Sequence, residues 1–382
     1  MAKRRGNNEG SITQLPNGLW QARISYVERG VHKRKAFYGK TRKEAVEKMQ
    51  QALAELQKGM PVISERTTVG EYLQMWLEDI ARATLRPRSH EKYAQVLRLY
   101  LLPHIGHIRL TKLTPAQVQK MLNQLVASGL SPSTAQYCHA VLRRALGQAE
   151  KWGMVARNVA KMVDTPKGER KKAQPLTLEQ IHALLEQARG HRLYALFVLA
   201  VSLGLRQGEL LGLRWQDVDF EHGLLHVRVQ LQRVGGRFAL LEPKSESSRR
   251  TLQLPDFVAE ALRQHRANQL LERAQMGAEW RGEWDLVFLT SAGTPINSRN
   301  LLRTYYGLLR KAGIPRVPFH TLRHTAASWL LAMGCDIRTV QAVLGHSQIG
   351  ITADLYTHIV PALLKDAAQK MEQLFRPPEK LA

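Results

Sequence analysis

The pattern of apolar positions over the first sixty residues is typical of short β-strands followed by one helix. Runs rich in aromatic and β-branched residues, separated by glycine-containing turns, cover residues 11–15, 20–26 and 32–38. The segment Thr41-Arg42-Lys43-Glu44 then matches a capping box and predicts a helix that ends near Gly59. We therefore expect a three-stranded sheet with one helix.

From about residue 67 to about residue 162 the apolar positions change to helical spacing. Two amphipathic faces recur at Val69, Tyr72, Leu73, Trp76 and Leu77, and at Tyr93, Val96, Leu97, Tyr100 and Leu101. Thr114-Pro115 and Ser131-Pro132 each supply an N-cap with proline at the first helical position. The pattern predicts a compact bundle of about four helices. Polar segments at 61–67 and 164–172 are interpreted as linkers, the second flexible enough to cross DNA.

The remaining residues mix helical and strand patterns. A helix begins at Thr177, and the nearly all-apolar run from Tyr194 to Leu203 predicts a fully buried helix. Residues 224–230 alternate as a strand, and Gly235-Gly236 predicts a hairpin turn before residues 238–241. A further hairpin is expected, with Lys244 at its tip and residues 249–252 returning. The fold class is therefore mainly α with small β-sheets (α+β).

Charge narrows the choice of partner. The chain has 382 residues and carries 56 Lys and Arg against 32 Asp and Glu, which gives a formal charge of +24 and a pI near 10.3. A polyanion is the expected partner, with nucleic acid ahead of an acidic membrane surface. Only Cys138 and Cys335 are present, so the sequence supports neither a disulfide framework nor a cysteine zinc site. The basic start is not a secretory signal, and no apolar run is long enough for a bilayer, so a soluble cytoplasmic protein without membrane contact is expected.

Basic residues on two of the predicted segments are candidates for DNA contact. A three-stranded sheet can lay basic side chains in a DNA groove, and exposed arginines of a helical bundle can face phosphates. The alternative for each single residue is a solvated surface charge. The DNA-binding candidates are Arg23, Lys33, Arg34 and Lys35 on the sheet, and Arg143 and Arg144 on the bundle.

Several residues of the last half could carry chemistry. Arg206 follows a buried helix, where Glu209 could orient it, although an ordinary buried ion pair is the alternative. Lys244 lies in a loop, where it is either solvated or able to protonate a leaving oxygen. His320 and Arg323 lie three residues apart on one predicted helical face, and His324 follows. Zinc is not expected there, because a HExxH glutamate is absent and Arg323 would repel a metal.

Two further candidates complete the set. Leu344-Gly345-His346 closes an amphipathic helix, and Tyr356 lies just beyond it in Tyr356-Thr357-His358. Two guanidiniums, an amine and two imidazoles are the donors that a pentacoordinate phosphorane needs, and a tyrosine is a candidate attacking oxygen. Taken alone, Tyr356 is better explained as a packing residue.

Together these strings resemble the tyrosine recombinase family, in its phage and transposon integrase form. Over residues 171–375 the chain contains Gly-Leu-Arg-x-Gly-Glu, Pro-Lys-Ser, His-x-Leu-Arg-His, Leu-Gly-His and Tyr-Thr-His in the family order. The resemblance implies that Tyr356 is the nucleophile and that five residues activate the phosphate: Arg206, Lys244, His320, Arg323 and His346. It further implies an arm-type DNA-binding domain at 1–60, a SAM-like core-binding domain at 67–163 and a catalytic domain at 171–382. Residues 157–160 depart from the Asn-Pro usual in relatives.

The implied reaction needs neither a cofactor nor a metal. Attack by Tyr356 on a DNA phosphorus leaves a 3′-phosphotyrosyl bond, and a second strand's 5′ hydroxyl reverses the step on a new partner. Exchange between two duplexes needs four cuts, so the expected partners are double-stranded DNA, with core and arm-type sites, and a homotetramer. A DNA-bending protein and an excisionase are further candidate partners. The alternatives are a type IB topoisomerase-like nicking and resealing enzyme, or a non-catalytic DNA-binding regulator.

Overall fold

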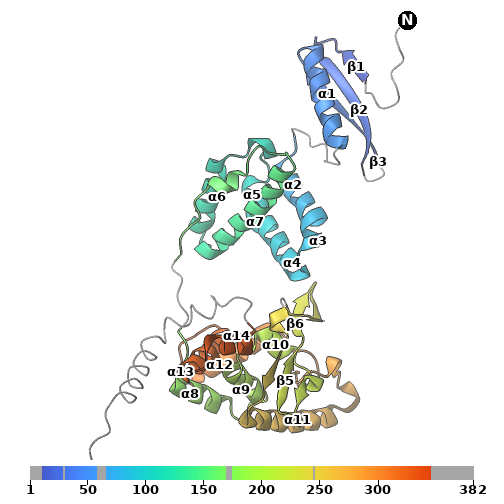
Figure 1. The fold of residues 1–382 in the computed structure, drawn as a ribbon. Coiled ribbons are helices and arrows are strands. Elements are labelled where there is room, and N and C mark those ends of the chain that lie inside the picture. Colours follow the sequence, from blue (N-terminus) through green and yellow to red (C-terminus); the bar gives the residue numbers. More distant parts are fainter. Residues whose placement is uncertain (1–10, 29–30, 58–65, 169–173, 244–245, 346–382) are drawn as a thin grey trace, which may run out of the picture. The chain divides into compact units, whose positions relative to one another are not determined.

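The computed structural model describes residues 11–28, 31–57, 66–168, 174–243 and 246–345 (Figure 1). The chain separates into two compact units, residues 1–169 and 170–382. Helices dominate both units and the sheets are small and antiparallel, as the sequence predicted. The finer division of the first unit into 1–60 and 67–163 stays a prediction.

The first unit contains a sheet followed by helices. Its elements are β1 (Ser11–Gln14), β2 (Trp20–Glu28), β3 (Val31–Gly39), α1 (Arg42–Gln57), α2 (Val69–Met75), α3 (Arg82–Thr84), α4 (Pro87–Val96), α5 (Leu102–Ile105), α6 (Pro115–Ala127) and α7 (Pro132–Lys151).

The N-terminal sheet has the order β1-β2-β3, and α1 packs against it. Ala22 and Ile24 of β2 and Ala45 and Met49 of α1 form its small core. These strands and the helix confirm the predicted sheet. The capping box is half formed, because the Thr41 hydroxyl accepts from the Glu44 N–H while the Glu44 carboxylate accepts from the N–H of residue 40, one residue too early.

Four helical stretches form the bundle, as predicted. The first two run from α2 to α3 and from α4 to α5 through π-helical turns at Trp76–Ala81 and Leu97–Leu101. Thr114 caps α6 with a complete capping box, and Ser131 caps α7, each followed by proline. The buried Tyr72 hydroxyl donates to the carbonyl of Ala145 at 2.6 Å, which joins α2 to α7.

Hydrogen bonds join the first residues after the bundle, 164–166, to helices α6 and α7. The Gln119 side chain donates to the Asp164 carbonyl at 3.2 Å and accepts from the Asp164 N–H at 3.2 Å. The Gln136 amide donates to the Pro166 carbonyl at 2.6 Å. The expectation of a flexible linker over 164–172 is therefore wrong for residues 164–166, because two glutamines of α6 and α7 satisfy their backbone groups. Residues 169–173 lie outside the described part.

The second unit holds a mixed arrangement of helices and short strands. Its elements are α8 (Leu178–Ala188), α9 (Tyr194–Ser202), α10 (Gln207–Leu211), β4 (Val218–Asp219), β5 (Leu224–Val227), β6 (Gln230–Val234), β7 (Arg237–Leu241), β8 (Arg250–Gln253), α11 (Asp256–Met276), α12 (Ser298–Lys311), α13 (Thr321–Ala332) and α14 (Ile337–Leu344).

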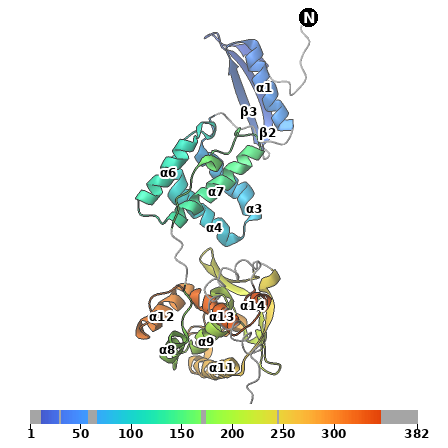
Figure 2. The ribbon, with the colours of Figure 1, turned by 60° about the vertical axis from the view of Figure 1, so that its left-hand side comes forward.

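Helix α9 is the centre of this unit. Its residues from Ala195 to Ala200 are all buried, and α8, α11 and α13 pack around it (Figure 2). This confirms the buried helix predicted from an apolar pattern that shows no polar face. The chain is further joined across the unit at Leu176, whose N–H donates to Thr325 and whose carbonyl accepts from Trp329, both on α13.

The strands differ from the prediction in two ways. The expected single strand over 224–230 breaks at residues 228–229 into β5 and β6, which belong to different sheets. The β6–β7 hairpin forms as predicted, with positive φ at both Gly235 and Gly236. The next hairpin does not form, because β8 pairs with β5 rather than with β7. The segment that contains Lys244 therefore connects two sheets.

Candidate active site

The turn after α9 and the buried carboxylate of Glu209 together position Arg206. Gly204, with φ of +60°, ends the stretch after α9, and Arg206 precedes α10 as its N-cap. Glu209 Oε2 accepts from the Arg206 backbone N–H at 2.9 Å, and Oε1 accepts from Arg206 Nη1 at 2.7 Å. Glu209 is 2% exposed and Arg206 is 34% exposed. The predicted pairing of Arg206 with Glu209 is confirmed, and the Arg206 side chain stays partly exposed.

Arg323 lies beside this turn. It is on the first turn of α13 and only 2% exposed. Its Nη1 donates to the Gly204 carbonyl at 2.7 Å, and its Nη2 donates to the Leu344 carbonyl at 2.5 Å. Residues separated by well over a hundred positions in the sequence are thereby held together at one point of the fold.

The C-terminal end of α14 binds three arginines through three consecutive carbonyls. Val343 accepts from Arg250 Nε at 2.6 Å, Leu344 from Arg323, and Gly345 from Arg206 Nη2 at 2.8 Å. The last carbonyls of a helix lack partners within the helix and carry partial negative charge, so they attract cations. The end of α14 therefore gathers both predicted arginines at one place.

Histidines border the arginines. His320 immediately precedes α13, and its ring meets that of His324 edge to face, with centroids 4.7 Å apart. His320 is exposed over the residue as a whole, yet desolvation by the protein atoms around its ring, together with the charges of His324 and Arg323, lowers its pKa to about 4. His320 is therefore neutral at pH 7 and able to accept a proton.

Burial and like charge also act on the other ionisable groups. Burial, together with the nearby charge of Arg206, lowers the pKa of Arg323 to about 9. Burial alone would raise the pKa of Glu209, but Arg250 and Arg206 together bring it below its ordinary value. At neutral pH the cluster thus holds three cations around one carboxylate. Such an excess of positive charge suits an anionic ligand.

The structure brings together three of the six predicted active-site residues: Arg206, His320 and Arg323. The other three, Lys244, His346 and Tyr356, lie outside the described residues, as does the predicted apolar stripe after Pro361. Among the described residues, no group of three or more acidic, histidine or cysteine side chains could hold a metal ion. None of the described helices has the length and apolarity that a membrane span requires.

Sequence reasoning missed the part played by Arg250. It named this residue only as part of a returning strand. A signal was present, because Arg250 lies two residues before the buried Leu252 and so shares the inward face of a strand.

The predicted DNA-binding residues lie in the first unit. Arg23, Arg34, Arg143 and Arg144 are all exposed, while the side chains of residues 33 and 35 lie outside the described part. Arg144 stands over the ring of Tyr93, 5.9 Å from its centroid, and donates to its hydroxyl at 3.3 Å. Exposure is compatible with phosphate contact and with a solvated surface alike.

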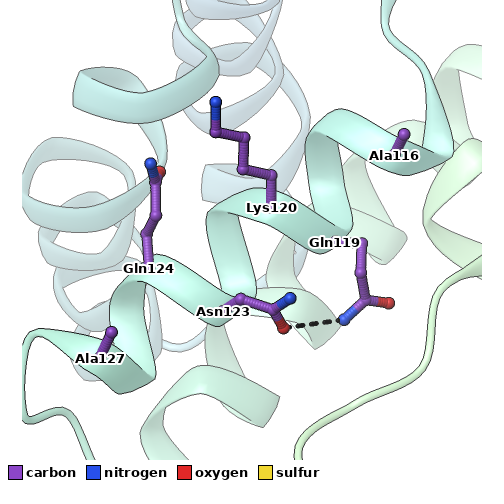
Figure 3. Close-up of a pocket in the computed structure, with 6 residues that line it drawn as sticks. All are labelled: Ala116, Gln119, Lys120, Asn123, Gln124 and Ala127. Carbon is purple, nitrogen blue, oxygen red and sulfur yellow. Dashed lines mark hydrogen bonds between the residues drawn. The ribbon is translucent and has the colours of Figure 1, made fainter.

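Two of the hollows in the described part of the chain bear on where chemistry could take place, one far from this cluster in the sequence and one that includes Arg250. One, of about 470 Å³ on α6, is lined by alanines, amides and one cation: Ala116, Gln119, Lys120, Asn123, Gln124 and Ala127 (Figure 3). It offers no nucleophile or acid and base pair. The other, of about 690 Å³ in the second unit, is lined at the edge of β5 and β8 by residues that include His226, Arg228 and Arg250. Chemistry is therefore expected at the arginine cluster.

Gly204 supplies a first prediction, on stability. A Cβ at this position would lie 2.6 Å from Leu344 Cδ2 and 3.2 Å from Ala326 Cβ. We expect Gly204→Ala to lower the free energy of unfolding by about 1–2 kcal/mol for the left-handed backbone and by about 1–3 kcal/mol more for overpacking. Urea denaturation measures the loss.

Gly190→Ala is the matched control, because Gly190 has φ of +76° and nothing within 4 Å of the added Cβ. It should show the backbone cost alone. Equal losses in the two variants would contradict the packing argument.

Comparisons with known proteins agree with this geometry. The Phage integrase family model matches residues 174–362, and the model of the phage integrase N-terminal SAM-like domain matches residues 68–126. A tyrosine recombinase XerC-like protein of Caldanaerobacter subterraneus subsp. tengcongensis is 34% identical over 370 residues, covering 92% of this chain and 95% of that protein. An integrase of Saccharopolyspora erythraea is 27% identical over 430 residues, covering 97% and 98%.

Solved structures share the fold. The Tn1549 transposon integrase in complex with a circular intermediate DNA superposes with a TM-score of 0.67 at 21% identity, covering 79% of this chain and 99% of that one. A lambda integrase tetramer bound to a Holliday junction gives a TM-score of 0.58 at 18% identity, covering 92% and 96%.

Proposed function

Because the chain belongs to the tyrosine recombinase family, we propose that it integrates a mobile element, excises it, or does both, through a 3′-phosphotyrosyl intermediate. Members of this family cleave and rejoin DNA strands, and the chain is a site-specific DNA recombinase. The observation that supports the proposed chemistry is the convergence of Arg206 and Arg323 on the end of α14, directly before His346 in the sequence.

The proposed cleavage step balances as a transesterification. The Tyr356 oxygen forms a bond to a DNA phosphorus while the bond from phosphorus to the 5′ oxygen breaks. His320, neutral at pH 7, takes the phenolic proton, and Lys244 protonates the departing 5′ oxygen. A 5′ hydroxyl of another strand reverses the step, so the energy of the phosphodiester is kept and no cofactor is consumed.

We assign stabilisation of the transition state to basic side chains that the fold holds in place. Arg206 and Arg323 donate hydrogen bonds to the non-bridging phosphate oxygens as their negative charge grows, and His346 adds a donor. Arg206 suits this task because its guanidinium is held by Glu209 while its side chain stays partly exposed. Groups that are already oriented need no reorganisation during the reaction, which is why such electrostatic terms are large.

The proposed partners follow from the reaction and the charge. The chain carries +24 formal charge, and we assign its substrate as double-stranded DNA with core and arm-type sites. Strand exchange between two duplexes needs four nucleophiles, hence a homotetramer on DNA. A DNA-bending protein and an excisionase are proposed as accessory factors, and the cytoplasm as the place of action.

One assay tests the proposal against its rivals. The protein is incubated with nicked suicide DNA made from sequences that flank its own gene, and denaturing gels are examined for a protein–DNA adduct. A recombinase gives an adduct at the 3′ end and, on intact sites, exchanged strands. Relaxation of supercoiled DNA without exchange would indicate a topoisomerase-like enzyme. Binding without any adduct would indicate a regulator and overturn the proposal.

The pH dependence of cleavage gives a second prediction. His320 can accept a proton only while neutral, and its pKa is lowered to about 4. We therefore expect the single-turnover cleavage rate at subsaturating DNA to stay level from about pH 8 to about pH 5 and to fall below that, whereas an ordinary histidine would give a midpoint of about 6.5.

The test is a pH profile of adduct formation at subsaturating DNA, where the rate reports the pKa values of the DNA-free protein. His320→Gln serves as the comparison, because it should be slow throughout and lack the acid limb. A wild-type midpoint near the ordinary histidine value would contradict the proposed state of His320.

A further inference from the structure

We infer that Arg250 is a positioning residue, which holds Arg206 through Glu209 and anchors the end of α14. The inference rests on the proposed function and adds to it a residue outside the six that the family motifs supply. Its Nε, Nη1 and Nη2 each donate to a group of the second unit, so we assign it to its neighbours rather than to DNA.

Arg250 uses its donors on three separate parts of the second unit. Nη2 donates to Glu209 Oε2 of α10 at 3.1 Å, and Nε donates to the Val343 carbonyl of α14 at 2.6 Å. Nη1 donates to the Ser248 carbonyl at 3.1 Å, in the turn before β8. A planar fork of five N–H groups can make these bonds at once, whereas an ammonium group cannot reproduce their geometry.

The contacts connect Arg250 to Arg206 by two routes. The first passes through one carboxylate, since Glu209 Oε2 binds Arg250 and Oε1 binds Arg206. The second passes through the end of α14, where Arg250 binds the carbonyl of Val343 and Arg206 binds the carbonyl of Gly345. Displacing Arg250 would therefore remove one partner from each of these two supports of Arg206, which also donates to the Ser248 hydroxyl at 3.4 Å.

Close packing at Gly345 fits the same arrangement. Gly345 has φ of +65°, and a Cβ there would lie 2.8 Å from the Ser247 carbonyl oxygen and 3.0 Å from Arg250 Nη1. Only glycine allows the helix end to approach the guanidinium this closely. The residue that follows Gly345 in the sequence is His346, so the same contact fixes the point from which that segment departs.

A purely stabilising role explains the cluster poorly. Arg206 already neutralises Glu209, so Arg250 adds a second cation to a buried carboxylate and crowds three guanidiniums together. Removing an extra charge from water carries a desolvation penalty that lowers the stability of the fold. A cluster with no role beyond stability is therefore not expected to contain a third buried arginine. The cost is understandable where the arginine that binds substrate must be held in a fixed orientation, because a displacement of about 1 Å can lower a rate by about 100-fold.

The test compares Arg250→Met, Arg250→Lys and Arg250→Ala with Arg189→Met in the full-length protein. Arg189 is the matched control, because it also pairs with a glutamate, Glu186, but is 73% exposed. We expect Arg250→Met and Arg250→Lys to slow single-turnover adduct formation at saturating DNA by about 10- to 100-fold, with the Kd for DNA nearly unchanged. Arg189→Met should match the wild type in both.

Two further measurements separate positioning from folding. Added guanidinium ion should restore much of the rate of Arg250→Ala and leave Arg189→Ala unaffected. Combining Arg250→Met with Glu209→Gln should slow cleavage by less than the product of the single effects, because both act on Arg206.

The outcomes are distinguishable. Wild-type cleavage rates in Arg250→Met, or independent effects in the double variant, would overturn the role of Arg250 while leaving the proposed function intact. A slow variant that guanidinium does not rescue, with a loss of folded protein that accounts for the lower rate, would also overturn it. Absence of any adduct from the wild type would overturn the proposed function and this inference together.

Discussion

Tyr356→Phe is expected to form no covalent adduct with suicide DNA, while binding that DNA as tightly as the wild type. The substitution removes only the phenolic oxygen, which is the proposed attacking atom, and leaves the rest of the side chain unchanged. Because the proposed reaction has a single nucleophile, the loss should be complete rather than partial. Adduct yield on denaturing gels and a mobility-shift assay of binding measure the two quantities.

Tyr306→Phe is the control for removal of a tyrosine hydroxyl. Tyr306 lies on α12, and its ring packs against the guanidinium of Arg316, 4.2 Å from the ring centroid. Its variant should form adduct at the wild-type rate. Adduct formation by Tyr356→Phe would mean that another residue is the nucleophile, and mapping the DNA-linked peptide would identify it.

Glu209→Gln is expected to lower the free energy of unfolding by about 3–5 kcal/mol, the cost of leaving buried charges without their partner. The amide keeps the shape of the side chain but removes the negative charge between Arg206 and Arg250. Its NH2 group also meets guanidinium donors and cannot accept from them. Cleavage should fall as well, because Arg206 loses the bonds that orient it.

Urea denaturation and single-turnover cleavage check this second expectation. Glu186→Gln is the matched control, because Glu186 pairs with Arg189 at a surface position and is 62% exposed. Exposed pairs contribute about 0–1 kcal/mol, so this variant should be nearly as stable as the wild type. If the two variants lost equal stability, the carboxylate of Glu209 would not have the electrostatic role assigned to it.

Elements whose signals are local could be predicted from the sequence. The first three strands, the caps at Thr114, Ser131 and Thr177 and the buried α9 depend on side-chain period, on N-cap chemistry and on the lack of a polar face. Strand pairing was less predictable. Whether residues 250–253 pair with β7 or with β5 depends on contacts between distant segments, which alternation along one strand does not encode.

The features of the candidate site also fall into those with a local sequence signal and those that depend on contacts between distant segments. The sequence by itself determined the basic character of the chain, a set of candidate residues and the Arg206–Glu209 pair, because spacing of three residues across a helix start is a local relation. Only the tertiary structure decided that Arg206, Arg250 and Arg323 meet at three consecutive carbonyls of α14. A helix end attracts whatever cations the packing brings to it, and that packing is set by the whole core around α9.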